Sequence, residues 1–373
     1  MLAPGIRRGN FPWLPPTTFL LPGVALVAAV VAWAVSTSAP VSTDGVALPT
    51  IAATEIRSVA YFQPDRETRV DRLLIREATP GTEPRTIVAY PYTFTGLHAR
   101  GNAAPTGDRI AVLSVDGTKG SAATLTIVEL DGATRVVEGG FEYLSSFAWT
   151  PDGRRLAVIA SGDPGVTRVL EVEVTGGQAT EVARFTAVFQ VVPLGYSVDG
   201  SRLYIVVIDQ SGSNLWMVRG GIVQRLAELS PGRTRDWTLS PDGSRVAFVD
   251  ILSASSRTYV GKTLTIATGA VTTLQAGRNQ IGATWQPGNP LPVFGGPGGS
   301  LQLEDPRPEV AWVVPHAYAP LGDHVVISTI ASEQNDQSRP AVSLWIASPE
   351  RREFLTDEPG ASFIGWVRGG PWQ

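Results

Sequence analysis

The segment Leu239-Ser-Pro-Asp-Gly-Ser-Arg-Val-Ala-Phe248 contains the phrase on which the fold of this 373-residue chain depends. An apolar residue precedes a Pro-Asp-Gly turn, and a basic residue and an apolar strand follow it. Related copies occur at four other places: Ala103–Val112, Trp149–Val158, Tyr196–Ile205 and Tyr318–Ile327. Measured at the proline position of each copy and at Pro287, the intervals are 46, 47, 43, 46 and 33 residues. Repeats of about 40–50 residues built from short strands predict an all-β protein, a β-propeller.

The repeated phrase has a mechanical role in each unit. Proline presets φ for a turn, aspartate bonds to the nearby backbone, and glycine accepts a positive φ. The phrase therefore predicts the hairpin that joins the inner strand of a blade to its second strand. The residues two and four positions before the proline, such as Trp149 and Phe147, are expected on one face of the inner strand. There they would pack one blade against the next.

The remaining strands predict four-stranded antiparallel blades that close into a ring. Inner strands are expected near residues 97, 147, 194, 237, 284, 317 and 364, which indicates seven blades. The unit from Trp285 to Tyr318 is short and rich in glycine and proline, so six blades with an insertion are the alternative. Residues 57–90 supply later strands without an inner strand, whereas residues 362–367 resemble an inner strand without followers. We expect these two segments to pair, which closes the propeller over residues 55–373 and removes exposed sheet edges.

An uncharged apolar run extends from Phe19 to Val35. A helix needs about 20 apolar residues to span a bilayer, and residues 17–36 reach that length. Arg7 and Arg8 precede the run, so the positive-inside rule places the N-terminus in the cytoplasm. The sequence thus predicts three segments before the propeller: a cytoplasmic stub (1–16), a transmembrane anchor or signal anchor (17–36) and a linker (37–54).

This arrangement predicts a single-pass protein of a bacterial cytoplasmic membrane, with its propeller on the periplasmic or extracellular side. The alternative is a signal peptide that is cleaved near Ala34 and releases a secreted protein, because Ala32-Trp33-Ala34 has the small-x-small pattern of a cleavage site.

Two of the copies, Trp149–Val158 and Ser240–Phe248, resemble the Pro-Asp-Gly repeats of TolB-like, WD40-like bacterial propellers. The resemblance covers residues 55–373 and implies the propeller fold. Propellers of this kind include periplasmic interaction proteins, peptidase lids and a few enzymes, so the resemblance does not select one function. The N-terminal α/β domain of TolB has no counterpart here, so the partners of TolB are not carried over to this chain.

Composition and motifs argue against several classes of function. The net charge of −4 argues against nucleic acid as a partner, because phosphate binding needs a basic face. The chain has no cysteine, which excludes disulfides, thiolate metal sites and a cysteine nucleophile. No Gly-x-Ser-x-Gly motif occurs, and the three histidines lack metal-ligand spacing. We therefore expect no catalytic residue, metal or cofactor, and we favour a binding protein over an enzyme.

Polar residues at or just before the expected inner strands are the candidates for a binding site at the rim of the central channel. They are His98, Arg100, Glu142, Gln190, Arg235, Asp236, Gln280 and His316. The alternative is that these side chains form only a solvated rim.

The predicted function is a membrane-anchored docking module for protein partners at or near the membrane, or an accessory subunit of a membrane or envelope complex. The alternative is an enzyme or carbohydrate or ligand binder that uses the channel mouth. Candidates gathered in one pocket would favour the alternative, whereas dispersed candidates beside exposed apolar residues would favour docking.

Overall fold

The computed structural model describes residues 55–92, 97–115, 122–160, 162, 164–253, 258–274, 279–297, 300–301, 310–331 and 342–369. The chain divides into two compact units, Met1–Ala47 and Leu48–Gln373, and the described residues belong to the second. Within them all regular structure is β-strand, and no helix is long and apolar enough to cross a membrane. The predicted stub, anchor and linker at residues 1–54 lie outside the described residues.

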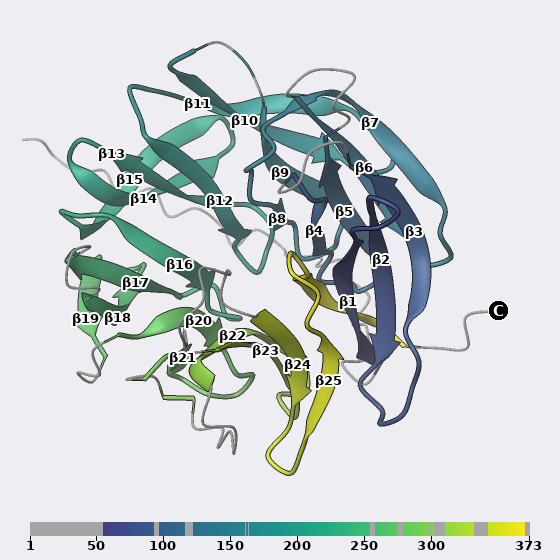
Figure 1. Ribbon diagram of the computed structural model, residues 1–373. Coiled ribbons are helices and arrows are strands. Elements are labelled where there is room, and N and C mark those ends of the chain that lie inside the picture. Colours follow the sequence, from purple (N-terminus) through teal and green to yellow (C-terminus); the bar gives the residue numbers. More distant parts are fainter. Residues whose placement is uncertain are drawn as a thin grey trace, which may run out of the picture. The chain divides into compact units, whose positions relative to one another are not determined.

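Antiparallel sheets surround a common centre within the second unit (Figure 1). The first sheet has the order β26 (Ser362–Arg368), β1 (Ile56–Asp65), β2 (Val70–Glu77) and β3 (Arg85–Pro91). Two groups of four strands follow: β4 (Arg100–Ala103), β5 (Arg109–Ser114), β6 (Ala123–Glu129) and β7 (Thr134–Phe141), then β8 (Ala148–Trp149), β9 (Arg155–Ala160), β10 (Val166–Glu173) and β11 (Ala179–Thr186). The single pair Phe141–Ala160 links these groups into one sheet of eight strands.

The other sheets follow in chain order. Three have four strands: β12 (Gln190–Tyr196), β13 (Leu203–Asp209), β14 (Gly212–Arg219) and β15 (Ile222–Ser230); β16 (Thr234–Leu239), β17 (Arg245–Ser253), β18 (Thr258–Thr265) and β19 (Ala270–Thr273); and β22 (Val310–Tyr318), β23 (Val325–Ala331), β24 (Val342–Ala347) and β25 (Arg352–Thr356). Between the last two lies a sheet with two described strands, β20 (Ile281–Trp285) and β21 (Pro292–Gly295).

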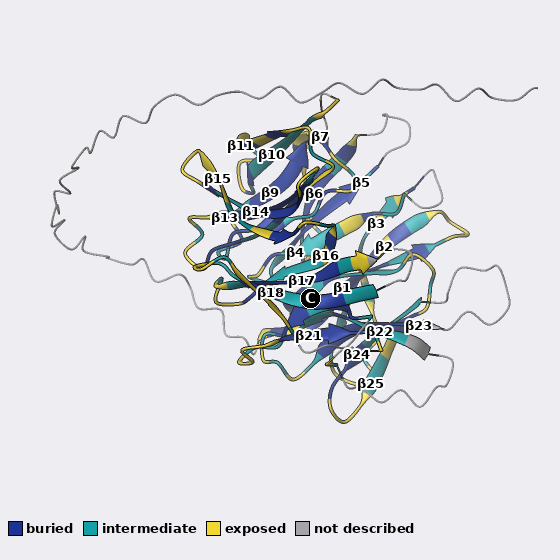
Figure 2. Cartoon of the chain, turned by 90° about the vertical axis from the view of Figure 1, so that its left-hand side faces the viewer, coloured by how far each residue is buried: buried dark blue, intermediate teal, exposed yellow. Residues whose placement is uncertain are grey.

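The second strand of each four-stranded group is an almost continuous apolar run. In β13, for example, every residue from Leu203 to Ile208 is buried. A strand reads this way when both faces of its sheet are covered by protein. Figure 2 shows buried residues along strands such as β5 and β9, and exposed residues in the hairpins and along β15.

The apolar core is divided into clusters, each formed between neighbouring sheets. One cluster joins Phe62 of β1 to Ile110 of β5. Another joins Val206 of β13 to Phe248 of β17. Burial of apolar surface is the dominant favourable contribution to folding, so these sheets stabilise one another and not only themselves.

Successive inner strands are also joined by hydrogen bonds from tryptophan indoles. Each indole Nε1 donates to a main-chain carbonyl of the preceding inner strand: Trp149 to Asn102 (3.2 Å), Trp285 to Thr238 (3.4 Å) and Trp366 to Ala317 (3.0 Å). Trp149 and Trp285 lie two residues before the proline of the repeat, and Trp366 takes the same place in the last inner strand. The predicted packing of one blade on the next is therefore confirmed at these residues.

The C-terminal strand completes the first sheet. β26 pairs antiparallel with β1, with Trp366 opposite Val59. The last inner strand thus joins strands from the start of the described chain, as the sequence predicts. This pairing covers the sheet edges that the two ends of the chain would otherwise expose.

The prediction that residues two and four positions before the proline share a face is wrong in two copies. Leu194 packs in the cluster with Phe248, whereas Tyr196 packs in the preceding one with Ile205. The pairing of β12 with β13 shifts between Pro193 and Gly195, and that of β22 with β23 shifts between Pro315 and Ala317. A β-bulge shifts the alternation of side chains by one residue, so the two positions come to lie on opposite faces.

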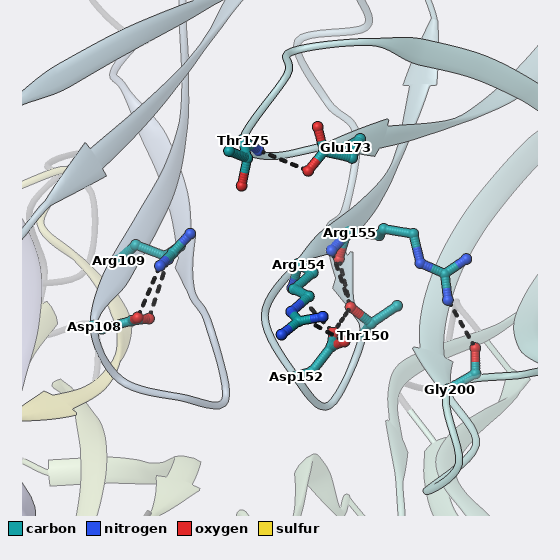
Figure 3. Close-up of polar contacts among 9 residues, drawn as sticks. All are labelled: Asp108, Arg109, Thr150, Asp152, Arg154, Arg155, Glu173, Thr175 and Gly200. Atoms are coloured by element: carbon teal, nitrogen blue, oxygen red, sulfur yellow. Dashed lines mark hydrogen bonds and ion pairs between the residues drawn. The ribbon is translucent and has the colours of Figure 1, made fainter. Parts of the chain in front are cut away.

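The Pro-Asp-Gly turns share one set of hydrogen bonds, which Figure 3 shows for the turn that contains Thr150 and Asp152. Thr150 Oγ1 donates to Asp152 Oδ1 (2.6 Å) and accepts from Arg155 N (3.0 Å), while Arg154 N donates to Asp152 Oδ1 (3.0 Å). Ser197 with Asp199, and Ser240 with Asp242, repeat the arrangement. The hydroxyl before the proline position was not part of the sequence prediction, although it is present in all three copies.

Neighbouring turns contact one another. Arg155 Nη2 donates to the carbonyl of Gly200 in the next turn (3.3 Å), and Arg245 Nη1 donates to that of Pro290 (2.7 Å). Gly153 has a φ of 66°, and a Cβ at this position would lie 2.7 Å from Thr106 Oγ1 of the preceding turn. Glycine is therefore required there both for its conformation and for the close approach.

We expect Trp366→Phe to lower the free energy of unfolding by about 1 kcal/mol more than Trp216→Phe, measured by urea denaturation and circular dichroism. Both changes remove the same atoms, but Trp366 loses its bond to Ala317, whereas the buried Nε1 of Trp216 has no hydrogen-bond partner among the described residues. Equal losses would contradict the role assigned to the indole bond.

Asp199 should contribute to the stability of the protein in acid. Hydrogen bonds from Ser197 and Ser201 lower its pKa from 3.8 to about 2. A carboxyl whose pKa is lower in the folded state stabilises above the unfolded pKa, and this contribution is lost as the pH falls from 3.8 towards 2. Between pH 4 and pH 2 the melting temperature should therefore fall further for the wild type than for Asp199→Asn. Parallel curves would refute this assignment.

Candidate functional site

The sheet topology places most of the candidate residues at one end of the ring. Each inner strand ends at its repeat turn and begins at the connection from the preceding sheet. We call the end with the turns the turn face. The opposite end, which carries the connections at residues 142–147, 187–189 and 231–233, is the loop face. Six candidates lie at or just before the start of an inner strand or in one of these connections: His98, Arg100, Glu142, Gln190, Arg235 and Gln280.

His98 belongs to a polar network that holds the start of β4. Its Nδ1 lies 2.8 Å from Oδ1 of Asp71, a carboxylate that is only 1% exposed. The other oxygen of Asp71 accepts from Ala99 N (2.6 Å), and Tyr143 Oη donates to the His98 carbonyl (2.6 Å). A Cβ on Gly360 would lie 3.0 Å from His98 Nε2, so main chain covers that edge of the ring. These contacts indicate a structural role for the Asp71–His98 pair.

Arg100 is the first residue of β4 and is exposed. Its guanidinium carbon lies 5.8 Å from the ring centroid of Tyr143, within the range of a cation–π contact. Arg233 makes the same kind of contact with Phe189, at 5.5 Å. Tyr143, Phe189 and Arg233 were not predicted from the sequence. The sequence feature that could have identified two of them is their position, because Phe189 directly precedes β12 and Arg233 directly precedes β16.

Arg235 and Asp236 form an ion pair with each other, with Arg235 Nε 3.0 Å from Asp236 Oδ1. The other oxygen of Asp236 accepts from Gly282 N of β20 (2.8 Å). Asp236 has a φ of 54°, a left-handed conformation that is costly for a residue with a side chain. Its carboxylate is therefore used to join two neighbouring inner strands.

The remaining candidates at the loop face differ in exposure. Glu142 and Gln190 are exposed, and Glu142 N donates to the Ile159 carbonyl (3.0 Å). Gln280 is only 3% exposed, and its Oε1 accepts from Gly261 N (2.6 Å). The expectation that Gln280 lines an accessible rim is thus corrected, because its amide satisfies a buried backbone group.

His316 lies near the end of β22, whereas the other candidates lie at or near the start of an inner strand. Its Nε2 is 2.6 Å from Ser328 Oγ, and its ring centroid is 5.6 Å from that of Phe363. The side chain keeps some access to solvent, yet the surrounding protein lowers its pKa from 6.5 to about 4, against an opposing effect of Asp236. The imidazole is therefore neutral at neutral pH.

The contacts divide the candidates into separate groups. His98 and Arg100 contact residues of β2 and the 142–147 connection, whereas Arg235, Asp236 and His316 belong to the region of β16, β20 and β22. A cavity of about 490 Å³ beside Arg155 and Tyr196, and one of about 280 Å³ beside Trp285, contain none of the eight. Among the described residues, no three His, Asp or Glu side chains are placed to hold a metal ion.

The architecture is that of a β-propeller, and known structures share it. TolB from Acinetobacter baumannii superimposes with a TM-score of 0.53 at 16% identity, over 82% of this chain and 65% of that one. The propeller domain of the trilobed protease from Pyrococcus furiosus, which has an open velcro topology, gives 0.54 at 12% identity, over 82% and 95%. An oligogalacturonate lyase in complex with manganese gives 0.51 at 13% identity, over 79% and 91%.

These likenesses establish a TolB-like β-propeller fold and nothing beyond the fold. This chain spans 65% of the length of the TolB chain. No protein-family model and no curated protein matches the sequence. Unlike the open topology described for the archaeal propeller, the first sheet here contains both the first and the last described strand.

We expect the imidazole of His316 to titrate near pH 4 in a histidine-labelled NMR experiment, because burial disfavours its charged form. The chain has only three histidines, so His316→Gln assigns the signal. Since the unfolded state binds this proton more readily, His316 should reduce the stability of the fold as the pH falls from 6.5 to about 4. A transition of this signal at pH 6.5 would overturn the placement of His316 in a crowded environment.

Proposed function

We propose that this chain is a docking module that presents its loop face to a protein partner. The observation that carries the proposal is the exposure of large apolar side chains at that face: Leu144 (66%), Phe189 (62%) and Leu252 (58%). Leu144 and Phe189 lie on the connections 142–147 and 187–189, and Leu252 lies near the end of β17. Exposed apolar residues of this size are typical of an interaction site, and the repeat turns also expose Val198, Leu291 and Leu321.

The proposed architecture is a propeller of seven blades. Six would have four strands, with the two halves of the eight-stranded sheet counted separately, and β20 and β21 would form the seventh. Supporting this count, Trp285 of β20 bonds to β16, and Gly282 lies against Val314 and Pro315 of β22. These contacts on both sides support counting the two-stranded sheet as a blade.

The proposed location is a bacterial cytoplasmic membrane, with residues 17–36 as the anchor and the propeller outside. The support is the length of the apolar run and the position of Arg7 and Arg8 before it. Anchoring would confine the loop face to partners at or near the membrane. The protein would then serve as a docking module or as an accessory subunit of a membrane or envelope complex.

The dispersal of the candidate residues weighs against the alternative function, an enzyme or carbohydrate binder at the channel mouth. The most enzyme-like pair, Asp71 and His98, uses both carboxylate oxygens within the fold, and Gly360 lies against the free edge of the imidazole. The polar atoms of Asp236 are likewise engaged by Arg235 and Gly282. Besides Glu142 and Gln190, the loop face exposes apolar side chains and arginines.

Affinity capture of the full-length protein from its own membranes in mild detergent, followed by mass spectrometry, tests the docking function. We expect a stoichiometric partner that is lost with the double variant Leu144→Ser, Phe189→Ser. Ile222→Ser is the matched control, because Ile222 is also 66% exposed but lies in the β14–β15 hairpin at the turn face. Recovery of the same partner with the double variant, or of no partner with the wild type, would refute docking through the loop face.

A further inference from the structure

Two arginines of the loop face rest on aromatic rings. Arg100 lies over Tyr143 and Arg233 over Phe189, at 5.8 and 5.5 Å from the ring centroids. Tyr143 and Phe189 belong to successive connections, at residues 142–147 and 187–189. Each pair therefore combines a flat apolar surface with a positive charge, and the two pairs lie on the same end of neighbouring sheets.

Neither of these arginines has a carboxylate partner among the described residues, and both are exposed. Some other basic side chains of the described part do have one: Arg155 pairs with Glu171 at 2.8 Å, and Lys262 with Asp250 at 2.5 Å. A guanidinium that stacks on a ring uses its flat face and keeps its N–H edge available for a carboxylate. Arg100 and Arg233 thus retain donors for an acidic group.

The fold holds the hydroxyl of Tyr143 and the main chain at Phe189. Tyr143 Oη donates to the His98 carbonyl (2.6 Å), and Phe189 N donates to the Ile208 carbonyl (2.8 Å). Ala187, two residues before Phe189, has a φ of 56°, a conformation that costs an alanine roughly 1 kcal/mol. The surroundings therefore impose this turn and direct Phe189 outward. Pre-organised side chains lose little entropy on binding.

We propose that the loop face binds an acidic protein segment, whose carboxylates pair with Arg100 and Arg233 while its apolar side chains pack on Leu144 and Phe189. This inference rests on the docking function and adds the chemistry of the partner. A protein segment fits better than an acidic polysaccharide, because aliphatic Leu144 lies directly beside Tyr143 and one face of the Phe189 ring is already covered by Arg233. Such a surface suits apolar side chains.

Glu142 provides a test of whether the ligand carries negative charge. It is exposed and lies next to Tyr143 in the same connection, where its charge opposes an acidic ligand. Asp236 is engaged by Arg235 and Gly282, so it opposes the ligand less. Glu142→Gln should therefore strengthen binding, whereas loss of the arginines should weaken it.

The experiment uses the purified full-length chain in detergent as bait for a displayed library of random 12-residue peptides. The affinity of the enriched peptides is then measured by fluorescence anisotropy. We expect enriched peptides with Asp or Glu beside large apolar residues. Arg100→Gln with Arg233→Gln should weaken their binding about tenfold, and Glu142→Gln should strengthen it about twofold. Arg219→Gln is the matched control, since Arg219 is exposed but ends β14 at the turn face.

The outcomes separate this inference from the docking function. The enriched peptides could depend on Phe189 and Leu144 yet lack acidic residues, or bind the arginine variant as tightly as the wild type. Either result would overturn the acidic nature of the partner but not the docking function. If alginate displaces the labelled peptides at a lower concentration than unlabelled peptides do, the ligand is an acidic polysaccharide and not a protein segment. If no peptide is enriched, both the inference and docking through this face fail.

Discussion

The contact between one sheet and the next is the constraint on which this structure depends. The second strands are apolar on both faces, so no sheet can bury its own surface without a neighbour on each side. Indole hydrogen bonds of 3.0–3.4 Å add direction to this packing, because each ties an inner strand to the carbonyl of the preceding one. The pairing of β26 with β1 extends the same contacts to the two ends of the described chain.

This arrangement also decides which side chains remain available for a partner. All inner strands begin at the loop face, so connections from different repeats lie at one end of the ring. Many polar groups there are used to hold the connections, as Asp71 does for Ala99 and Asp236 does for Gly282. Arg100, Arg233, Leu144 and Phe189 are left facing outward, and they define the chemistry of the surface.

Part of the candidate site was predictable from the sequence, and part was not. The start of each inner strand follows from the repeat, so the placement of His98, Arg100 and Arg235 near one end could be predicted. Burial of Gln280 could not, because it depends on Gly261 of another strand. The environment of His316 was also unpredictable, since a bulge at Pro315 shifts the strand alternation and turns the imidazole towards Ser328 and Phe363.

The propeller fold, the place of each turn and the pairing of the C-terminal strand could all be predicted from the amino-acid sequence. The turns depend on local chemistry, such as the hydrogen bonds between a hydroxyl and the turn aspartate, which recur in three of the copies. By contrast, the packing of distant segments sets which rim residues are engaged, which are exposed, and which aromatic ring lies beside Arg100 or Arg233. Those contacts join residues more than 40 positions apart, so no pattern within a single repeat predicts them.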